Sequence, residues 1–199
     1  MNRHGGPNVK KLIALALTAG MTVACSSQKE PATMALTGLE QAVSAAQPEI
    51  EKFAPDQMTG LNAAVASAKQ KLEGGDYASV IADVQTATTT LSTAAQSAAA
   101  RKAELTTEWA SFATMPAMVG QVTAKVTELT GMRRLPRGVT KATLAEAKVS
   151  LDTVTSLWSE ASGAFASGDL MAAVAKAKDV KPMVESLMSS LGMAAAAAK

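Results

Sequence analysis

Residues 144–191 decide the fold, and they read LAEAKVSLDTVTSLWSEASGAFASGDLMAAVAKAKDVKPMVESLMSSL. On both sides of Gly168-Asp169, apolar residues recur at alternating spacings of three and four, which places them on one face of a helix. The positions are Leu144, Ala147, Leu151, Val154, Trp158, Ala161 and Phe165, then Leu170, Ala173, Ala177, Val180, Val184, Leu187 and Leu191. Glycine permits a left-handed helix end, and aspartate caps the helix that follows. We therefore predict two antiparallel helices joined by a Gly-Asp turn.

The same pattern occurs 93 residues earlier, around Gly75-Asp76. Few residues are identical, but the apolar register is kept on both sides of the turn. The aligned pairs are Leu61 with Val154, Val65 with Trp158, Ala68 with Ala161, Leu72 with Phe165, Tyr77 with Leu170 and Ile81 with Val174. Two similar helix–turn–helix hairpins are therefore expected, with their apolar stripes buried.

Further helices are expected on both sides of the first hairpin. Leu36, Leu39, Val43, Ala46 and Ile50 form one stripe. Pro48 is expected to end or kink that helix near Gln47, because proline disfavours the helical conformation of the residue before it. A shorter helix is expected to end at Gly131.

Other residues mark the expected ends and weak points of helices. Nothing stops the helix that starts at Tyr77 before Met115-Pro116, although three adjacent threonines at 88–90 lower its propensity. Thr140 is the expected N-cap of the helix that follows the loop after Gly131. Pro182 is expected to kink the last helix.

Composition agrees with this pattern. The chain has 199 residues, of which 42 are alanine, a strong helix former, and only 3% are aromatic and 18% charged. We predict an all-α protein, an antiparallel bundle of five or six helices over residues 34–192, followed by a flexible tail at 193–199.

The N-terminal segment has the features of a secretory signal peptide. Arg3, Lys10 and Lys11 precede an apolar run over residues 12–24. A helix of that length spans roughly 20 Å, less than the roughly 30 Å of a bilayer's hydrocarbon core. Residues 1–24 are therefore predicted to be a signal peptide and not a permanent transmembrane helix.

The end of that run, Thr22-Val23-Ala24-Cys25, resembles the lipobox of bacterial lipoproteins, with threonine at a position where leucine is usual. The resemblance implies cleavage before Cys25, the only cysteine, and acyl chains on it that hold the protein in a membrane. Ordinary signal peptidase is the alternative: Ala24 suits its cut, whereas Thr22 stands where it favours alanine. Ser26 is compatible with transfer to an outer membrane facing the periplasm. Residues 26–33 are expected to form a polar tether.

Cleavage changes the chemical inventory of the chain. Removal of residues 1–24 takes three of the 19 basic residues and none of the 17 acids, which leaves a net charge of −1. That balance does not favour nucleic acid as a partner. His4, the only histidine, is also lost. Catalysis by Ser–His or Cys–His, and zinc or haem sites built on histidine or cysteine, are thereby excluded, so no cofactor or metal is predicted.

The candidate binding loop is the segment between Gly131 and Thr140, which holds Arg133, Arg134 and Arg137. Clustered guanidinium groups suit phosphates or carboxylates of lipid head groups or wall polymer, and a solvated basic loop is the alternative. Trp109 and Trp158 lie on apolar stripes and are expected in the core. Tyr77 is expected to pack within the first hairpin.

Two resemblances concern the helical region. Gly75-Asp76-Tyr77 resembles the turn of tetratricopeptide repeats, without their period. The stretch from Lys52 to Tyr77 is similar to an uncharacterised Ala-rich helical domain of bacterial envelope lipoproteins, which implies no known active site.

We expect a non-catalytic, membrane-anchored envelope lipoprotein that binds a protein or peptidoglycan partner. The alternative is a periplasmic carrier of an apolar small molecule or lipid, held between alanine-lined helices. A Ser–Lys or carboxylate enzyme is a third class, for which no convergent motif is present.

Overall fold

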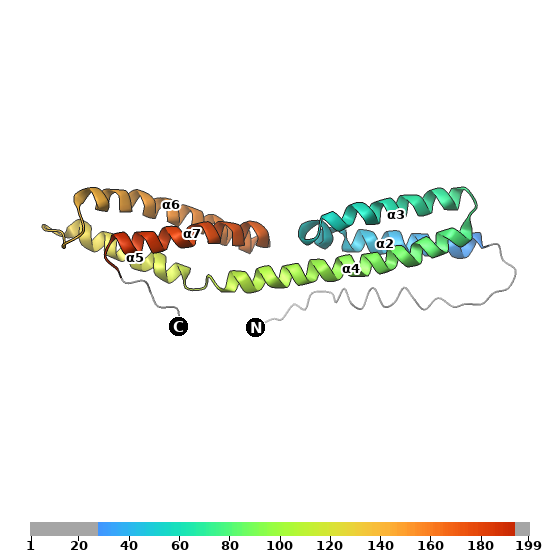
Figure 1. The fold of residues 1–199 in the computed structure, drawn as a ribbon, viewed down its shortest axis with the longest axis horizontal. Helices are drawn as coiled ribbons and strands as arrows, with labels where there is room; N and C mark the ends of the chain where they lie inside the picture. The colour runs from blue at the N-terminus through green and yellow to red at the C-terminus, as the bar shows by residue number, and fades with distance from the viewer. Residues whose placement is uncertain (1–27, 194–199) are drawn as a thin grey trace. The chain divides into compact units, whose positions relative to one another are not determined.

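The computed structural model describes residues 28–193, which contain six helices and no strand, so the all-α prediction is confirmed. Figure 1 labels the helices. They are α2 (Lys29–Phe53), α3 (Asp56–Glu73), α4 (Tyr77–Ala110), α5 (Met115–Gly131), α6 (Lys141–Ala166) and α7 (Leu170–Ser190). The predicted signal peptide and Cys25 lie outside the described residues, as does the predicted tail beyond Met193.

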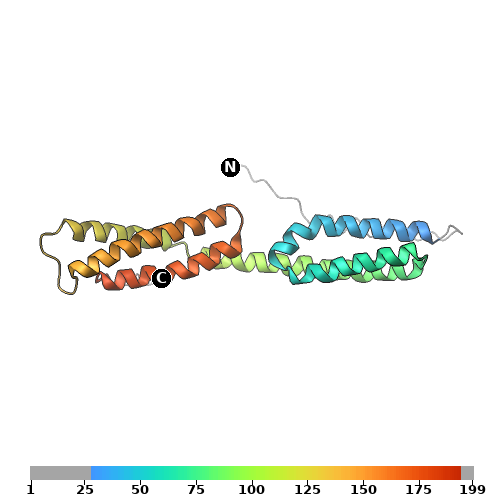
Figure 2. The same ribbon diagram turned by 90° about the horizontal axis from the view of Figure 1, so that it is seen from above.

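The helices belong to two compact units, whereas one bundle was expected over residues 34–192. Unit 1 ends at Arg101 and unit 2 begins at Lys102, so the boundary falls within α4. In unit 1, α2, α3 and the first part of α4 lie side by side (Figures 1 and 2). In unit 2, α5, α6 and α7 each contact the other two. Each unit is therefore built on three packed helices.

Helix α2 begins earlier than predicted, at Lys29. It continues through Pro48 to Phe53, so of the two expected outcomes at Pro48, an end or a kink, the helix end is wrong. Pro48 is exposed, so the carbonyl of Ser44 that loses its backbone partner can bond to water, while Ile50 and Phe53 are buried and hold the last turn.

The predicted tether over residues 26–33 is also wrong in its C-terminal part. Residues 29–33 form the start of α2 and do not extend the chain. Proline at position 31 is compatible with this, because backbone N–H groups in the first turn of a helix have no intrahelical partner.

Helix α4 passes without a break through the three threonines at 88–90. Their hydroxyl groups donate hydrogen bonds of 2.7–3.2 Å to backbone carbonyls four residues earlier. This bonding satisfies the hydroxyl groups on the helix itself. The expected weak spot is therefore an intact helix, which ends at Ala110, shortly before Met115-Pro116.

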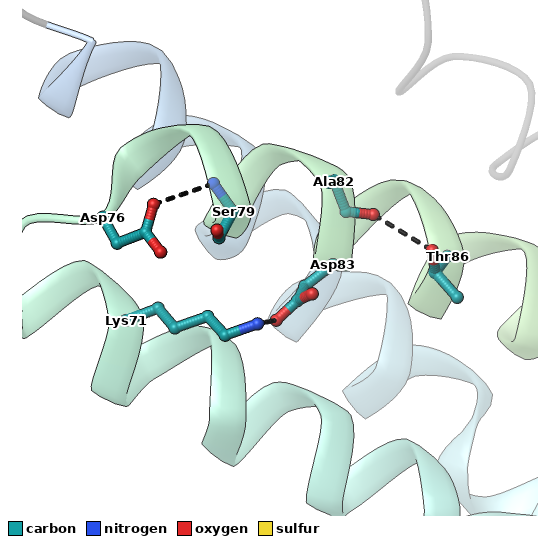
Figure 3. Close-up of polar contacts among 6 residues, drawn as sticks. All are labelled: Lys71, Asp76, Ser79, Ala82, Asp83 and Thr86. Atoms are coloured by element: carbon teal, nitrogen blue, oxygen red, sulfur yellow. Dashed lines mark hydrogen bonds and ion pairs between the residues drawn. The ribbon is translucent and has the colours of Figure 1, made fainter.

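The two predicted hairpins are present, α3–α4 in unit 1 and α6–α7 in unit 2. Their turns have matching backbones: Gly75 and Gly168 have φ of 81° and 78°, in the left-handed region. The carboxylates of Asp76 and Asp169 cap the following helices. Figure 3 shows the first turn and, beside it, the ion pair of 2.6 Å between Lys71 of α3 and Asp83 of α4.

The register of the core repeats as well. Each buried position of α4 in unit 1 has a buried counterpart 93 residues later at α7 or its C-cap. The pairs are Val80 and Ala173, Val84 and Ala177, Ala87 and Val180, Leu91 and Val184, Ala94 and Leu187, and Ala98 and Leu191. In α3 and α6, Met58 and Leu151, Leu61 and Val154, and Ala68 and Ala161 correspond in the same way. The predicted internal repeat is confirmed for both hairpins.

Candidate functional site

The candidate binding loop, defined here as residues 132–140, joins α5 to α6 in unit 2 and is held at the end that enters α6. The side chain of Val139 is only 9% exposed. Its N–H donates a 3.2 Å hydrogen bond to the carbonyl of Pro136. Gly138 lies between them with φ of 90°, a conformation that L side chains rarely adopt. The end of the loop that enters α6 is thus held in place by packing and by a backbone hydrogen bond.

Arg133, Arg134 and Arg137 are exposed, and none of the three forms an ion pair or hydrogen bond with another described residue. The local sequence supplies no acid to pair with them: residues 129–145 contain four basic residues and no aspartate or glutamate. The predicted cluster is therefore a local excess of positive charge on a chain that is nearly neutral as a whole.

The start of α6 adds to that excess. Thr140 caps the helix as predicted, since its hydroxyl accepts a 3.0 Å hydrogen bond from the N–H of Thr143. No acidic residue lies in the first turn of α6. The positive end of the helix dipole thus remains uncompensated by side-chain charge beside the arginines. Guanidinium groups so arranged can bind phosphate or carboxylate groups in a bidentate manner.

The two tryptophans were expected in the core, but neither is deeply buried. Trp109 near the end of α4 and Trp158 of α6 are both half-buried and stack with ring centroids 5.4 Å apart and planes 2° from parallel. Trp109 also stacks on Phe165, at 4.6 Å and 9°. Trp158 and Phe165 are two helical turns apart, roughly 10.5 Å along the axis. Because the two stacking distances fill that gap, Trp109 inserts between them.

This stack was missed by sequence reasoning, because it joins rings from separate helices at a partly exposed position. Phe165 is 37% exposed and was expected to be part of the core. The ion pair of 2.6 Å between Glu108 and Lys178 binds the same segment of α4 to α7. The stack and the ion pair together fix the end of α4 within unit 2. Tyr77, expected to pack in the hairpin, is half-buried.

Two open grooves are found, one in each unit. The groove in unit 2, of about 440 Å³, lies between α6 and α7 near Pro182 and is lined by a mixture of hydroxyl-bearing and apolar side chains. The groove in unit 1, of about 210 Å³, lies between α2 and α3 near Asn62. The predicted alternative, a carrier of a lipid or apolar molecule, stays a prediction.

Within residues 28–193, no side chain that is polar or charged is buried, and no group of three potential metal ligands is found. Hydrogen bonds from the side chain and the backbone of Ser79 lower the pKa of the Asp76 carboxyl, in keeping with its place as a helix cap. In the same part of the chain, no helix combines the length and apolar character needed to cross a bilayer.

No protein-family model, no curated protein and no solved structure matches this chain.

Proposed function

We propose that this protein is a non-catalytic module of the bacterial cell envelope, anchored by acyl chains on Cys25, that binds a partner through the candidate binding loop. The anchor rests on the lipobox-like sequence around the single cysteine. The proposed location is the periplasmic side of the outer membrane, with which Ser26 is compatible. The partner is a protein or wall polymer that carries anionic groups.

The observation that carries the binding proposal is the state of the three arginines. They are exposed on a loop with an anchored end, and no described residue neutralises them. Some other bases are paired: Lys71 with Asp83, Lys176 with Glu160 and Lys178 with Glu108, each at 2.6 Å. Charge left unpaired on an ordered loop is available to an external anion.

The architecture supports a binding role over catalysis. The described core consists of apolar side chains, and the ionisable groups lie outside it. An acid, base or nucleophile is usually activated by burial, and within residues 28–193 no polar or charged side chain is buried.

The anchor is tested by fractionating cells that express the wild-type chain or Cys25→Ala. We expect the wild-type chain in the membrane fraction and the variant in the soluble envelope fraction. An equal distribution of the two would contradict the anchor.

The partner is tested in the same cells by placing a photo-crosslinking amino acid at Leu135, within the loop. The matched control is Val149, which is 68% exposed on α6 of the same unit. We expect a discrete adduct from position 135 that is absent from position 149 and is lost when Arg133 and Arg134 are replaced by glutamine. The same adducts from both positions would contradict binding through the loop.

A further inference from the structure

We propose that the candidate binding loop is a membrane-contact site that takes the phosphate groups of an anionic phospholipid bilayer. This goes beyond the proposed function, because it gives the same loop a lipid surface to bind in addition to a protein or wall-polymer partner. It does not require Cys25 to be acylated, since the loop lies more than 100 residues further along the chain.

Charge complementarity is the first argument. Arg133, Arg134, Arg137 and Lys141 lie within nine consecutive residues, and no acid lies between positions 129 and 145. A phospholipid surface presents a dense layer of phosphates, and an arginine fork can bind two phosphate oxygens at once. Each basic residue close to an anionic bilayer strengthens binding about fivefold.

Exposed apolar surface beside the charge is the second argument, and it separates a bilayer from a soluble polyanion. Met132 is 39% exposed and directly precedes Arg133-Arg134, and Leu135, which follows them, is half-buried. A bilayer interface takes up apolar side chains together with the bases that flank them. A soluble polyanion attracts the basic residues, but its binding gains nothing from exposed apolar side chains.

The shape of the loop is the third argument. The buried Val139 and the turn at Gly138 fix the end of the loop that enters α6. The three arginines and Met132 precede that anchor on exposed backbone. The binding groups are thus held on one short segment, which reduces the ordering entropy lost on contact.

The experiment uses the full chain with Cys25→Ala and Met132→Cys, which leaves one thiol, labelled with a dye whose emission shifts to the blue in an apolar environment. Vesicles are made of phosphatidylcholine alone or with one part in three phosphatidylglycerol. The control chain carries Cys25→Ala and Val149→Cys with the same dye. The leader is identical in all chains, so differences between them arise from the labelled site.

We expect a blue shift at position 132 with the anionic vesicles, little shift with phosphatidylcholine alone, and none at position 149. Arg133→Gln with Arg134→Gln should raise the lipid concentration at half-maximal shift about 30-fold. The matched pair Lys148→Gln and Lys181→Gln, exposed bases of the same unit, should change it less than threefold.

Four results would overturn the proposal. One is an equal shift with both kinds of vesicle, and another is a shift that survives replacement of the two arginines. The third is a response to soluble polyphosphate without any response to vesicles, which would assign the loop to an anionic polymer. Inorganic phosphate that abolishes the vesicle response at micromolar concentration would likewise assign the loop to free phosphate. Since this chain lacks Cys25, none of these results bears on the anchor, which the fractionation tests separately.

Discussion

Asp76 and Asp169, 93 residues apart, make the same hydrogen bonds. The Oδ1 atom of each accepts a bond of 3.2 Å from the backbone N–H three residues later, at Ser79 and Ala172. The backbone N–H of each donates to the carbonyl five residues earlier, at 3.0 and 2.8 Å. Each aspartate thereby helps to end one helix and begin the next, so the two hairpins are specified by the same local chemistry.

Gly75, the glycine before the aspartate, is predicted to be required because of its positive φ and not because a larger side chain would clash with neighbouring atoms. Gly75 has φ of 81°, and a Cβ added there meets nothing within 4 Å. Gly75→Ala should therefore cost about 1–2 kcal/mol through backbone strain alone. Gly60→Ala, in the interior of α3 and equally free of contacts, should instead stabilise by about 0.5–1 kcal/mol. Urea unfolding followed by circular dichroism measures both, and similar effects of the two changes would contradict this reading.

The cap at Asp76 is predicted to make stability depend on pH in acid. Hydrogen bonds to Ser79 lower the pKa of the folded-state carboxyl below its usual 3.8. The stabilisation is therefore complete above pH 3.8 and is lost as the pH falls through the folded-state pKa. Asp76→Asn keeps an acceptor but does not titrate. The difference in urea midpoint between the wild type and Asp76→Asn should narrow between pH 5 and pH 2, and a constant difference would refute the prediction.

The aromatic stack is predicted to stabilise unit 2. Trp109→Ala removes the ring that lies between Trp158 and Phe165 and should cost about 2–3 kcal/mol, less than a fully buried tryptophan because the site is half exposed. It should also abolish the near-ultraviolet circular dichroism that arises from coupling of the two tryptophans. Trp109→Phe keeps a stacked ring and should cost less than half as much. Equal losses for alanine and phenylalanine would show that stacking contributes nothing.

Alanine is predicted to set the distance between helices within each hairpin. Ala68 and Ala161 are 0% exposed and occupy equivalent positions in α3 and α6. Ala68→Leu and Ala161→Leu should each destabilise by about 1–3 kcal/mol, because the neighbouring helix leaves no room for the larger side chain. Ala99→Leu, at an exposed position of α4, should stay within about 0.5 kcal/mol of the wild type. Thermal unfolding of the three variants tests this, and a neutral Ala68→Leu would disprove it.

The parts of the fold that follow from local chemistry were predictable. The 3–4 spacing around Gly168 gave the helices of the second hairpin, and the shift of 93 gave the first. The end of α2 was not predictable from Pro48, because that end depends on tertiary burial of Ile50 and Phe53, which outweighs one lost hydrogen bond. The division into two units was also missed, since the apolar pattern runs through α4 without a break.

The candidate site was predictable in composition but not in state. The sequence places three arginines between two helices, and it cannot show that they lack partners, because ion pairs form between residues distant in the chain. For the stack at Trp109, the sequence predicted more burial than the structure shows. Its rings lie on apolar stripes, which predicted the core, and only the packing of α4 against α6 places them at a partly exposed position.

The most direct test of the anchored-module proposal is the intact mass of the protein purified from the membranes of cells that process bacterial lipoproteins. We predict a chain that begins at Cys25 and carries the added mass of a diacylglyceryl group and an amide-linked acyl chain, with nothing remaining of residues 1–24. A soluble chain that retains Met1 and an unmodified thiol at Cys25 would contradict the account.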